Sequence, residues 1–162
     1  MHCHNPYLVD LARHSCSTIS KYLMYRQWTA FYSFNELYER HVMLVEAMRS
    51  RDRMAVWNKI REHYEELGLE GGLIRVYGEV VAFTIGDRLS ADTYDVHFEK
   101  AYGELQGAYA MINREFARWV RARHPEIRYL NREDDMGVEG LRKAKQSYYP
   151  DLMVEKHTAV MK

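Results

Sequence analysis

The sequence predicts a single α/β (α+β) domain in which a mixed β-sheet is flanked by helices on both faces. Its 162 residues fit one domain, and 47% of them are hydrophobic, which is enough to enclose a core. Apolar residues recur every three or four positions in the first half and alternate after Gly71 and Gly72. Strand and helix patterns then follow one another, which is typical of a sheet covered by helices.

The N-terminal part of this single domain, 1–162, is predicted in two pieces. Residues 1–32 form an N-terminal segment without a clean apolar period, so its secondary structure is poorly defined and one strand is expected there. Residues 33–68 are predicted as a helical hairpin, because Ser33 and Glu36 form a capping box and a second period begins at about Asp52. The second helix is expected to bury Trp57, Ile60, Tyr64 and Leu67.

Residues 72–162 are predicted to form the sheet and the cofactor-side half of the domain. Residues 73–77 and 80–85 are typical of a β-hairpin closed by a tight turn at Gly78 and Glu79. A third strand alternates, so one face is expected to carry Tyr94, Val96 and Phe98, and the other Asp95, His97 and Glu99.

The remaining elements alternate between helix and strand. A helix that starts near Gly107 and ends before Pro125 is expected to turn inward Tyr109, Ile112, Phe116, Trp119 and Val120. A strand at 127–130, a helix at 137–148 and a last strand at 153–160 complete the chain, with parallel neighbours dominating this half.

Composition excludes several classes of protein. Lys plus Arg (23) equal Asp plus Glu (23), so no global field recruits nucleic acid or an anionic membrane. No apolar run approaches the roughly 20 residues of a spanning helix, so we expect a cytoplasmic protein without stable membrane insertion.

The two cysteines do not indicate a disulfide framework. A zinc-type ligand cluster near the N-terminus matches no established spacing, so no metal site is expected from His2, Cys3, His4, His14 and Cys16.

Three segments are candidates for chemistry at the carboxyl edge of the sheet. Residues 100–109 carry Gly103 and Gly107 just before a helix, where unpaired amides bind anions; an ordinary strand-to-helix loop is the alternative. Residues 131–137 are dense in polar groups, and Arg132 there suits a phosphate or carboxylate, unless it pairs with Glu133 or Asp134. Residues 140–150 carry basic and phenolic groups, including Lys145 and Tyr148, toward the same edge of the sheet. Positive charge in the last turns of a helix is also what the helix dipole favours, which is the structural alternative.

His97 and Glu99 complete the candidates, as a base and the group that orients it, or as a satisfied buried pair. The sequence has no Ser-His-Asp order, P-loop, HExxH or kinase pattern, which disfavours hydrolases, NTPases and metalloproteases. Group transfer to an amine needs only positioning, an oxyanion-binding amide and one proton acceptor.

Five blocks of sequence, in order, resemble an uncharacterised bacterial family related to the C-terminal domain of phosphatidylglycerol lysyltransferase, a branch of the GNAT superfamily. The blocks are residues 71–76, 81–86, 97–101, 131–137 and 140–145, and the likeness spans about residues 33 to 160. It implies a GNAT-like sheet and transfer of an acyl group to an amine or hydroxyl. The implied donor is aminoacyl-tRNA or acyl-coenzyme A, and the acceptor a small-molecule, lipid or peptide amine.

The resemblance also implies roles for residues. The GNAT loop that cradles pyrophosphate maps onto residues 103–108, although Gln106 directly precedes Gly107 and so departs from the usual spacing. Lys145 falls near the place of the tyrosine that GNAT enzymes use as general acid, and Tyr148 lies beyond it. The donor-binding candidates are Lys100, Gly103, Gln106, Gly107, Ala108, Asn131 and Arg132; the catalytic candidates are His97, Glu99, Asp134, Lys145 and Tyr148.

Members of this family carry two GNAT-like units, of which this chain resembles the second. A partner copy in a homodimer, or a second unit, would then complete the substrate site. The alternatives are a degenerate, non-catalytic binding module and half of a two-unit enzyme. tRNA binding is a further alternative, through a basic stripe formed by Arg114, Arg118, Arg121, Arg123 and Arg128. A solvated helix face explains the same arginines equally well.

Overall fold

The computed structural model describes residues 7–10, 26–31, 51–157 and 159, with side chains from residue 55 onward. The predicted helix that begins at Ser33 and the N-terminal histidine and cysteine cluster therefore lie outside the described residues. Three helices are described: α3 (Arg51–His63), α4 (Ala108–Arg123) and α5 (Glu139–Gln146).

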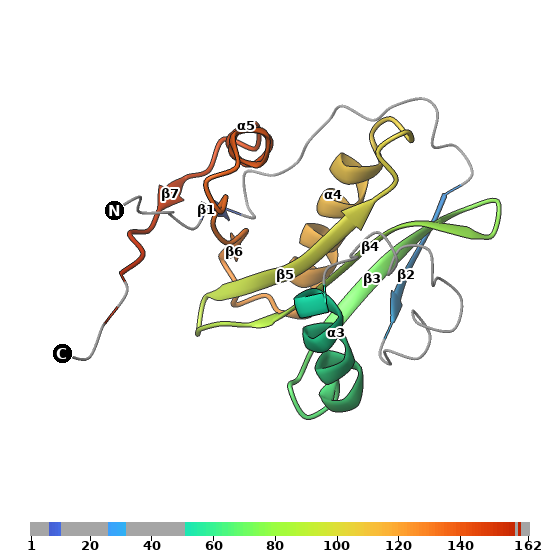
Figure 1. Cartoon of the computed structure of the whole chain (residues 1–162), viewed down its shortest axis with the longest axis horizontal. Coiled ribbons are helices and arrows are strands. Elements are labelled where there is room, and N and C mark those ends of the chain that lie inside the picture. The colour runs from blue at the N-terminus through green and yellow to red at the C-terminus, as the bar shows by residue number, and fades with distance from the viewer. Residues whose placement is uncertain (1–6, 11–25, 32–50, 158, 160–162) are drawn as a thin grey trace.

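The described strands form one mixed sheet in the order β2-β3-β4-β5-β6-β1-β7 (Figure 1). They are β1 (Tyr7–Asp10), β2 (Arg26–Phe31), β3 (Glu70–Val76), β4 (Glu79–Arg88), β5 (Thr93–Ala101), β6 (Tyr129–Asn131) and β7 (Leu152–Met153). Strands β2, β3, β4 and β5 pair antiparallel with one another in that order, β5 and β6 are parallel, and β1 lies antiparallel between β6 and β7. The mixed sheet is thus confirmed.

Two expectations about the second half are wrong. Parallel neighbours do not dominate, because β1 from the N-terminus inserts between β6 and β7 and leaves β5 and β6 as the parallel pair among the described strands. Of the last strand, expected over 153–160, the described residues form only the two-residue β7, which pairs with β1.

The sheet is covered by a helix on each face. Leu73 of β3 packs in a cluster with Trp57 of α3, whereas the next residue, Ile74, packs with Ile112 of α4. Because successive side chains of a strand point to opposite faces, α3 and α4 cover opposite faces. Figure 1 shows the two helices on either side of the central strands.

Two side chains expected to face the core are exposed. Leu67 is 52% exposed because α3 ends at His63 and Leu67 lies in the turn that follows. Tyr109 is 43% exposed in the first turn of α4, although it lies on the same side of the helix as the buried Phe116 and Val120.

The predicted hairpin between β3 and β4 is confirmed, with its turn one residue earlier than expected. Tyr77 and Gly78 occupy the two turn positions, and both have positive φ, 53° and 85°. That backbone matches the twist of the flanking strands, and Gly78 adopts it at no steric cost.

A β-bulge in β5 overturns the predicted alternation of that strand. Ile85 pairs with Phe98 and Gly86 with Val96, so His97 is an extra residue without an opposing partner on β4. Tyr94 and Val96 consequently pack against α4, but Phe98 packs against Trp57 of α3. Asp95 and Glu99, expected on one face, therefore lie on opposite faces of the sheet.

Gly86 of β4 permits this bulge. A Cβ added to Gly86 would lie 2.0 Å from the backbone oxygen of Asp95, because the two strands approach closely there. Glycine is the residue that leaves room for such an approach.

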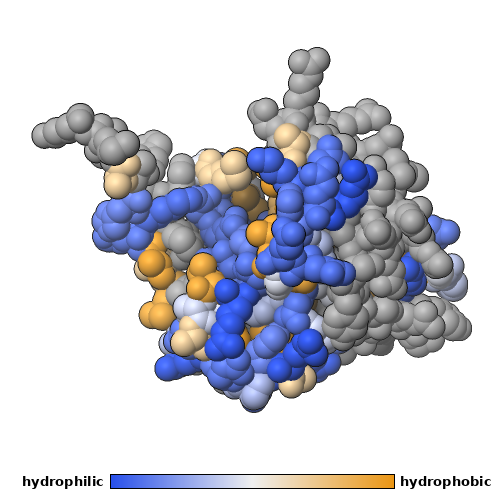
Figure 2. Space-filling view, turned by 90° about the horizontal axis from the view of Figure 1, so that it is seen from below, coloured by the Kyte–Doolittle hydropathy of each residue, from blue (hydrophilic) through white to orange (hydrophobic). Residues whose placement is uncertain are grey.

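The surface seen in Figure 2 is mainly hydrophilic, with apolar side chains scattered over it. Within the part of the chain that the structure describes, no helix is both long enough and apolar enough to cross a membrane.

Candidate functional site

The polar candidates gather where β5 and β6 part. The two strands pair over three positions that end at Asp95 and Asn131. Beyond them β5 continues to Ala101, whereas the chain leaves β6 through Arg132 and Glu133. Because the strands are parallel, Arg132 and Glu133 emerge at the carboxyl end of β6, beside the C-terminal half of β5, and ligands of such sheets bind beyond the carboxyl ends of strands.

A buried ion pair spans the two strands on the face that α4 covers. The Arg132 guanidinium donates to Glu99 Oε1 at 2.9 Å, and the two side chains are 12% and 7% exposed. Burial raises the pKa of the Glu99 carboxyl, although Arg132 opposes that rise. The second carboxylate oxygen of Glu99 and Nη1 of Arg132 are buried without a hydrogen-bond partner among the described residues.

Thr84 of β4 belongs to the same cluster and was not anticipated. It stands opposite Glu99 in the antiparallel register, and its buried hydroxyl has no hydrogen-bond partner among the described residues. The sequence feature that could have identified it is a polar residue inside the otherwise apolar run 80–85. Three buried polar atoms, from Thr84, Glu99 and Arg132, are thus left for a ligand or water to satisfy.

Residues of α5 and the turn after it hold Arg132 in place. The Arg132 guanidinium carbon lies 5.0 Å from the centre of the Tyr148 ring, a cation–π contact. The Lys145 amine donates to the backbone carbonyl oxygens of Arg132 and, at 2.6 Å, of Asp134. Burial lowers the pKa of Lys145, and the nearby Arg132 lowers it further. Glu99, Arg132, Lys145 and Tyr148 are therefore brought together.

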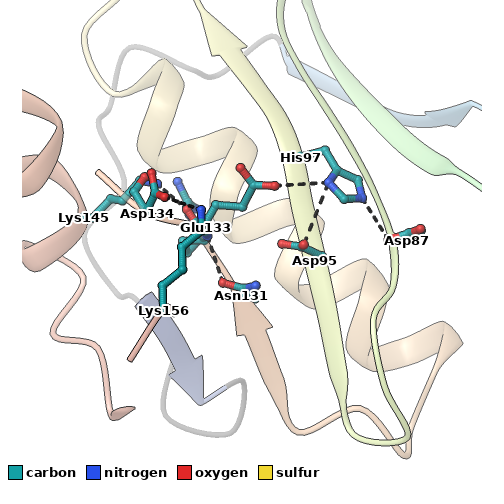
Figure 3. A network of polar contacts seen from close by, with 9 residues as sticks. Asp87, Asp95, His97, Asn131, Glu133, Asp134, Lys145 and Lys156 are labelled. Atoms are coloured by element: carbon teal, nitrogen blue, oxygen red, sulfur yellow. Dashed lines mark hydrogen bonds and ion pairs between the residues drawn. The ribbon is translucent and has the colours of Figure 1, made fainter. Parts of the chain in front are cut away.

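His97 belongs to a separate cluster (Figure 3). Its Nε2 lies 2.9 Å from Asp87, and its Nδ1 lies 3.2 Å from Glu133 and 3.8 Å from Asp95. The contact with Glu133 contributes most to raising the pKa of His97 to about 9, while burial opposes the rise and Asp87 adds to it. His97 therefore does not orient or assist Glu99, because the bulge turns it toward Asp87 and Asp95.

The side chains of Asn131 and Asp134 accept hydrogen bonds from backbone amides of their own segment. Asn131 Oδ1 accepts from the Glu133 amide and Asp134 Oδ1 from the Met136 amide, both at 2.9 Å. Asp134 also forms an ion pair of 2.6 Å with Lys156. These bonds hold a segment in which Glu133 and Met136 have positive φ. Asp134 and Asn131 are therefore engaged within their own segment and with Lys156.

The loop before α4 has the features of an anion site. Gly107 caps the helix with φ 86°, no side chain caps it, and the first turn contains no acidic residue. The first amides of a helix have no acceptor within it. Gly103 and Gln106 are exposed, Lys100 at the end of β5 is half-buried, and Ala108 is buried.

The proposed basic stripe is not continuous. Arg114 is 6% exposed and pairs with Glu115, so it points into the protein. Arg123 pairs with Glu70 at 2.7 Å. The exposed members are Arg118, Arg121, Arg123 and Arg128.

Comparison with known structures gives the class of protein. Over 94% of the chain, the fold matches a tandem GNAT protein from the clavulanic acid biosynthesis pathway, with a TM-score of 0.62, 11% identity and 51% of that structure covered. The C-terminal domain of a putative lysylphosphatidylglycerol synthetase from Agrobacterium fabrum matches with a TM-score of 0.63 and 11% identity, over 94% of this chain and 58% of that one. The chain therefore has a GNAT fold.

The particular family follows from the sequence itself. The chain belongs to the family of phosphatidylglycerol lysyltransferase C-terminal domains, whose model matches residues 47–160. A conserved protein of unknown function from Bacteroides thetaiotaomicron is 29% identical, with a TM-score of 0.74, over 94% of this chain. This chain spans 57% of that structure. No curated protein matches the chain.

Proposed function

We propose that this protein is an acyl- or aminoacyltransferase that moves an acyl group from a phosphate-rich donor to an amine or hydroxyl. The observation that carries the proposal is the buried Glu99 carboxylate at the carboxyl end of β5, with one oxygen on Arg132 and the other without a partner among the described residues. Membership in the lysyltransferase family and the GNAT fold support the same class of reaction.

Glu99 is the proposed proton acceptor. Formation of an amide or ester bond requires the attacking amine or hydroxyl to lose a proton, which a carboxylate beside it takes up. Burial raises the pKa of Glu99 and so makes it a stronger base than an exposed glutamate. Oε2, which has no partner in the described structure, is the atom that would receive the proton.

The start of α4 is the proposed binding place for donor phosphates. No side chain caps the helix at Gly107, and its first turn carries no negative charge to repel an anion, although the Ala108 amide donates to the Leu105 carbonyl oxygen. Acyl-coenzyme A and aminoacyl-tRNA both present phosphates, so both remain candidate donors.

The test is transfer by the purified chain and by its Glu99→Gln variant. Acyl-coenzyme A species and aminoacyl-tRNA are offered with amine and lipid acceptors, and the product is identified by mass. We expect the variant to bind the donor as the wild type does but to transfer at least roughly a hundredfold more slowly, since a positioned base contributes about 10²–10⁴ in rate. Equal transfer rates would remove Glu99 from the mechanism.

A non-catalytic binding module is the second candidate, and one observation favours it. Arg132 and Lys145, which a donor would engage, are already bonded within the protein, to Glu99 and to backbone carbonyls. This candidate predicts that a phosphate-bearing ligand raises the melting temperature without any turnover. Binding at 100 times the dissociation constant stabilises by about 2.7 kcal/mol, which a thermal-shift screen detects.

A further inference from the structure

The His97 cluster has a geometry that the proposed function does not use. Asp95 and His97 come from β5, Asp87 from the end of β4, and Glu133 from the segment after β6 (Figure 3). Three of them, Asp95, His97 and Glu133, each offer an atom within 4.8 Å of the other two. The bulge at His97 and the parallel register of Asp95 with Asn131 bring them together.

We propose that Asp95, His97 and Glu133 bind one divalent transition-metal ion of the zinc class through one nitrogen and two carboxylate oxygens. Donor atoms around a tetrahedral zinc ion with bonds of about 2.1 Å stand about 3.4 Å apart. His97 Nδ1 lies 3.2 Å from Glu133 Oε1 and 3.8 Å from Asp95 Oδ2, which brackets that spacing. An imidazole with two carboxylates is a ligand set that such ions accept.

Asp87 supplies the contact that orients the histidine. Its Oδ1 lies 2.9 Å from His97 Nε2, so it accepts the proton on that nitrogen, and an ion bound at Nδ1 displaces the proton that His97 otherwise shares with Glu133. Histidines that bind metals almost always donate their other ring N–H to such a partner. The contact with Asp87 therefore holds the ring with Nδ1 toward Asp95 and Glu133, as ligation requires.

The burial of Asp95 is a second observation that favours a cation at this site. Its side chain is 9% exposed, its carboxylate faces His97, and its Oδ1 is buried without a hydrogen-bond partner among the described residues. A buried carboxylate is costly unless it is paired or binds a metal. Three carboxylates surround one imidazole, so negative charge exceeds positive charge there even when His97 is protonated.

The site is reachable from solvent. The Glu133 side chain is 50% exposed, so an ion can enter beside it and keep water as a further ligand. The nearby amines of Lys145 and Lys156 are bonded to carbonyl groups or to the Asp134 carboxylate, rather than to Glu133. Three protein ligands with a position left for water is the pattern of an open rather than a structural zinc site.

The test is metal binding by the full chain after treatment with a chelator. Zn²⁺ is added and followed by calorimetry and by melting temperature, and Co²⁺ is added as an optical probe. We expect one Zn²⁺ per chain to bind at this site and raise the melting temperature, Mg²⁺ to have no such effect, and bound Co²⁺ to show no thiolate charge-transfer band. The absence of any Zn²⁺-dependent change would overturn the proposal.

Variants assign the ion to these residues. Asp95→Asn, His97→Gln and Glu133→Gln should each weaken Zn²⁺ binding at least tenfold, and Asp87→Asn should weaken it roughly 10–100-fold through the orientation of His97. His63→Gln is the matched control, because His63 pairs with the carboxylate of Glu66 at 2.7 Å on an exposed surface. The His63→Gln variant should bind Zn²⁺ with the affinity of the wild type.

The N-terminal cysteines provide the competing location. The double variant Cys3→Ser, Cys16→Ser should still bind Zn²⁺. If this double variant lost Zn²⁺ binding while Asp95→Asn and His97→Gln kept it, the proposal would be overturned. Far-UV circular dichroism of each variant shows that it is folded. Asp95→Asn is nearly isosteric and removes a buried charge, so it is expected to fold. This inference does not depend on the proposed transferase activity.

Discussion

At the scale of single residues, one extra residue in β5 decides which side chains cooperate. Without the bulge, Asp95, His97 and Glu99 would share a face. With it, His97 joins Asp87, Asp95 and Glu133, and Glu99 joins Arg132 on the other face. One histidine-and-carboxylate cluster and one buried ion pair result, each suited to different chemistry.

Removal of Arg132 provides a prediction at this scale. Arg132→Met should lower the free energy of unfolding by about 3 kcal/mol, because it leaves the buried Glu99 carboxylate without its cation. Adding Glu99→Gln should restore much of the loss, since the buried charge is then gone. Urea denaturation of the wild type, both single variants and the double variant measures the coupling.

The matched control is Arg118→Met. Arg118 is 58% exposed and lies 3.7 Å from Glu115, so its loss should cost less than about 0.5 kcal/mol. Strictly additive effects of Arg132→Met and Glu99→Gln would contradict the ion pair.

At the scale of elements, a polar cluster ties the start of β3 to the end of α4. Glu70 accepts hydrogen bonds from Arg123 at 2.7 Å and from His124 at 2.6 Å, and the Tyr94 hydroxyl of β5 donates to it at 3.0 Å. Burial raises the pKa of Glu70, but the hydrogen bonds outweigh burial and hold it below its usual value. The cluster fixes α4 against the sheet.

Stability should therefore depend on the charge of Glu70. A carboxylate whose pKa is lowered by folding stabilises the protein above its unfolded pKa, and that contribution is lost as the pH falls through the lower, folded value. Glu70→Gln should reduce the free energy of unfolding by about 1–2 kcal/mol at pH 7 and by much less at pH 3. Thermal unfolding across this pH range measures it.

Glu126→Gln is the control for that pH profile. Glu126 forms an ion pair with Arg88 in which both side chains are more than 40% exposed, so little change is expected at either pH. An equal loss for Glu70→Gln at pH 3 and pH 7 would show that charge is not the cause.

At the scale of the whole molecule, the N-terminus completes the C-terminal part of the sheet. Leu8 of β1 pairs with Asn131 of β6 on one side and with Leu152 of β7 on the other. Figure 1 shows these three short strands together at the end of the sheet away from β2. The segment that carries Arg132 therefore depends on residues more than a hundred positions earlier in the chain.

Deletion of residues 1–10 tests this dependence. It removes β1, so we expect the melting temperature to fall by several degrees, since about 1 kcal/mol corresponds to roughly 2–4 °C at this size. The exposed edges of β6 and β7 should also promote aggregation, which light scattering detects. Deletion of residues 1–6 alone keeps β1 and is the control; equal melting temperatures for both deletions would contradict the role of β1.

The sequence by itself determined the elements between residues 51 and 146. Helix α3, the β3–β4 hairpin, β5, α4 and α5 each bury an apolar pattern or follow a turn signal that local spacing reveals. It also pointed to Glu99, Arg132, Lys145 and Tyr148, because polar residues at the ends of strands and on the following helix stand out from an apolar pattern.

Only the tertiary structure decided how those residues are paired. The bulge at His97 depends on the close approach of Gly86 to Asp95, and the place of β1 depends on strands far along the chain. Asp87, which lies beyond the strand predicted over residues 80–85, contacts His97 because β4 extends to Arg88. Local spacing cannot reveal these features, because strand register and long-range pairing are set by packing between distant segments.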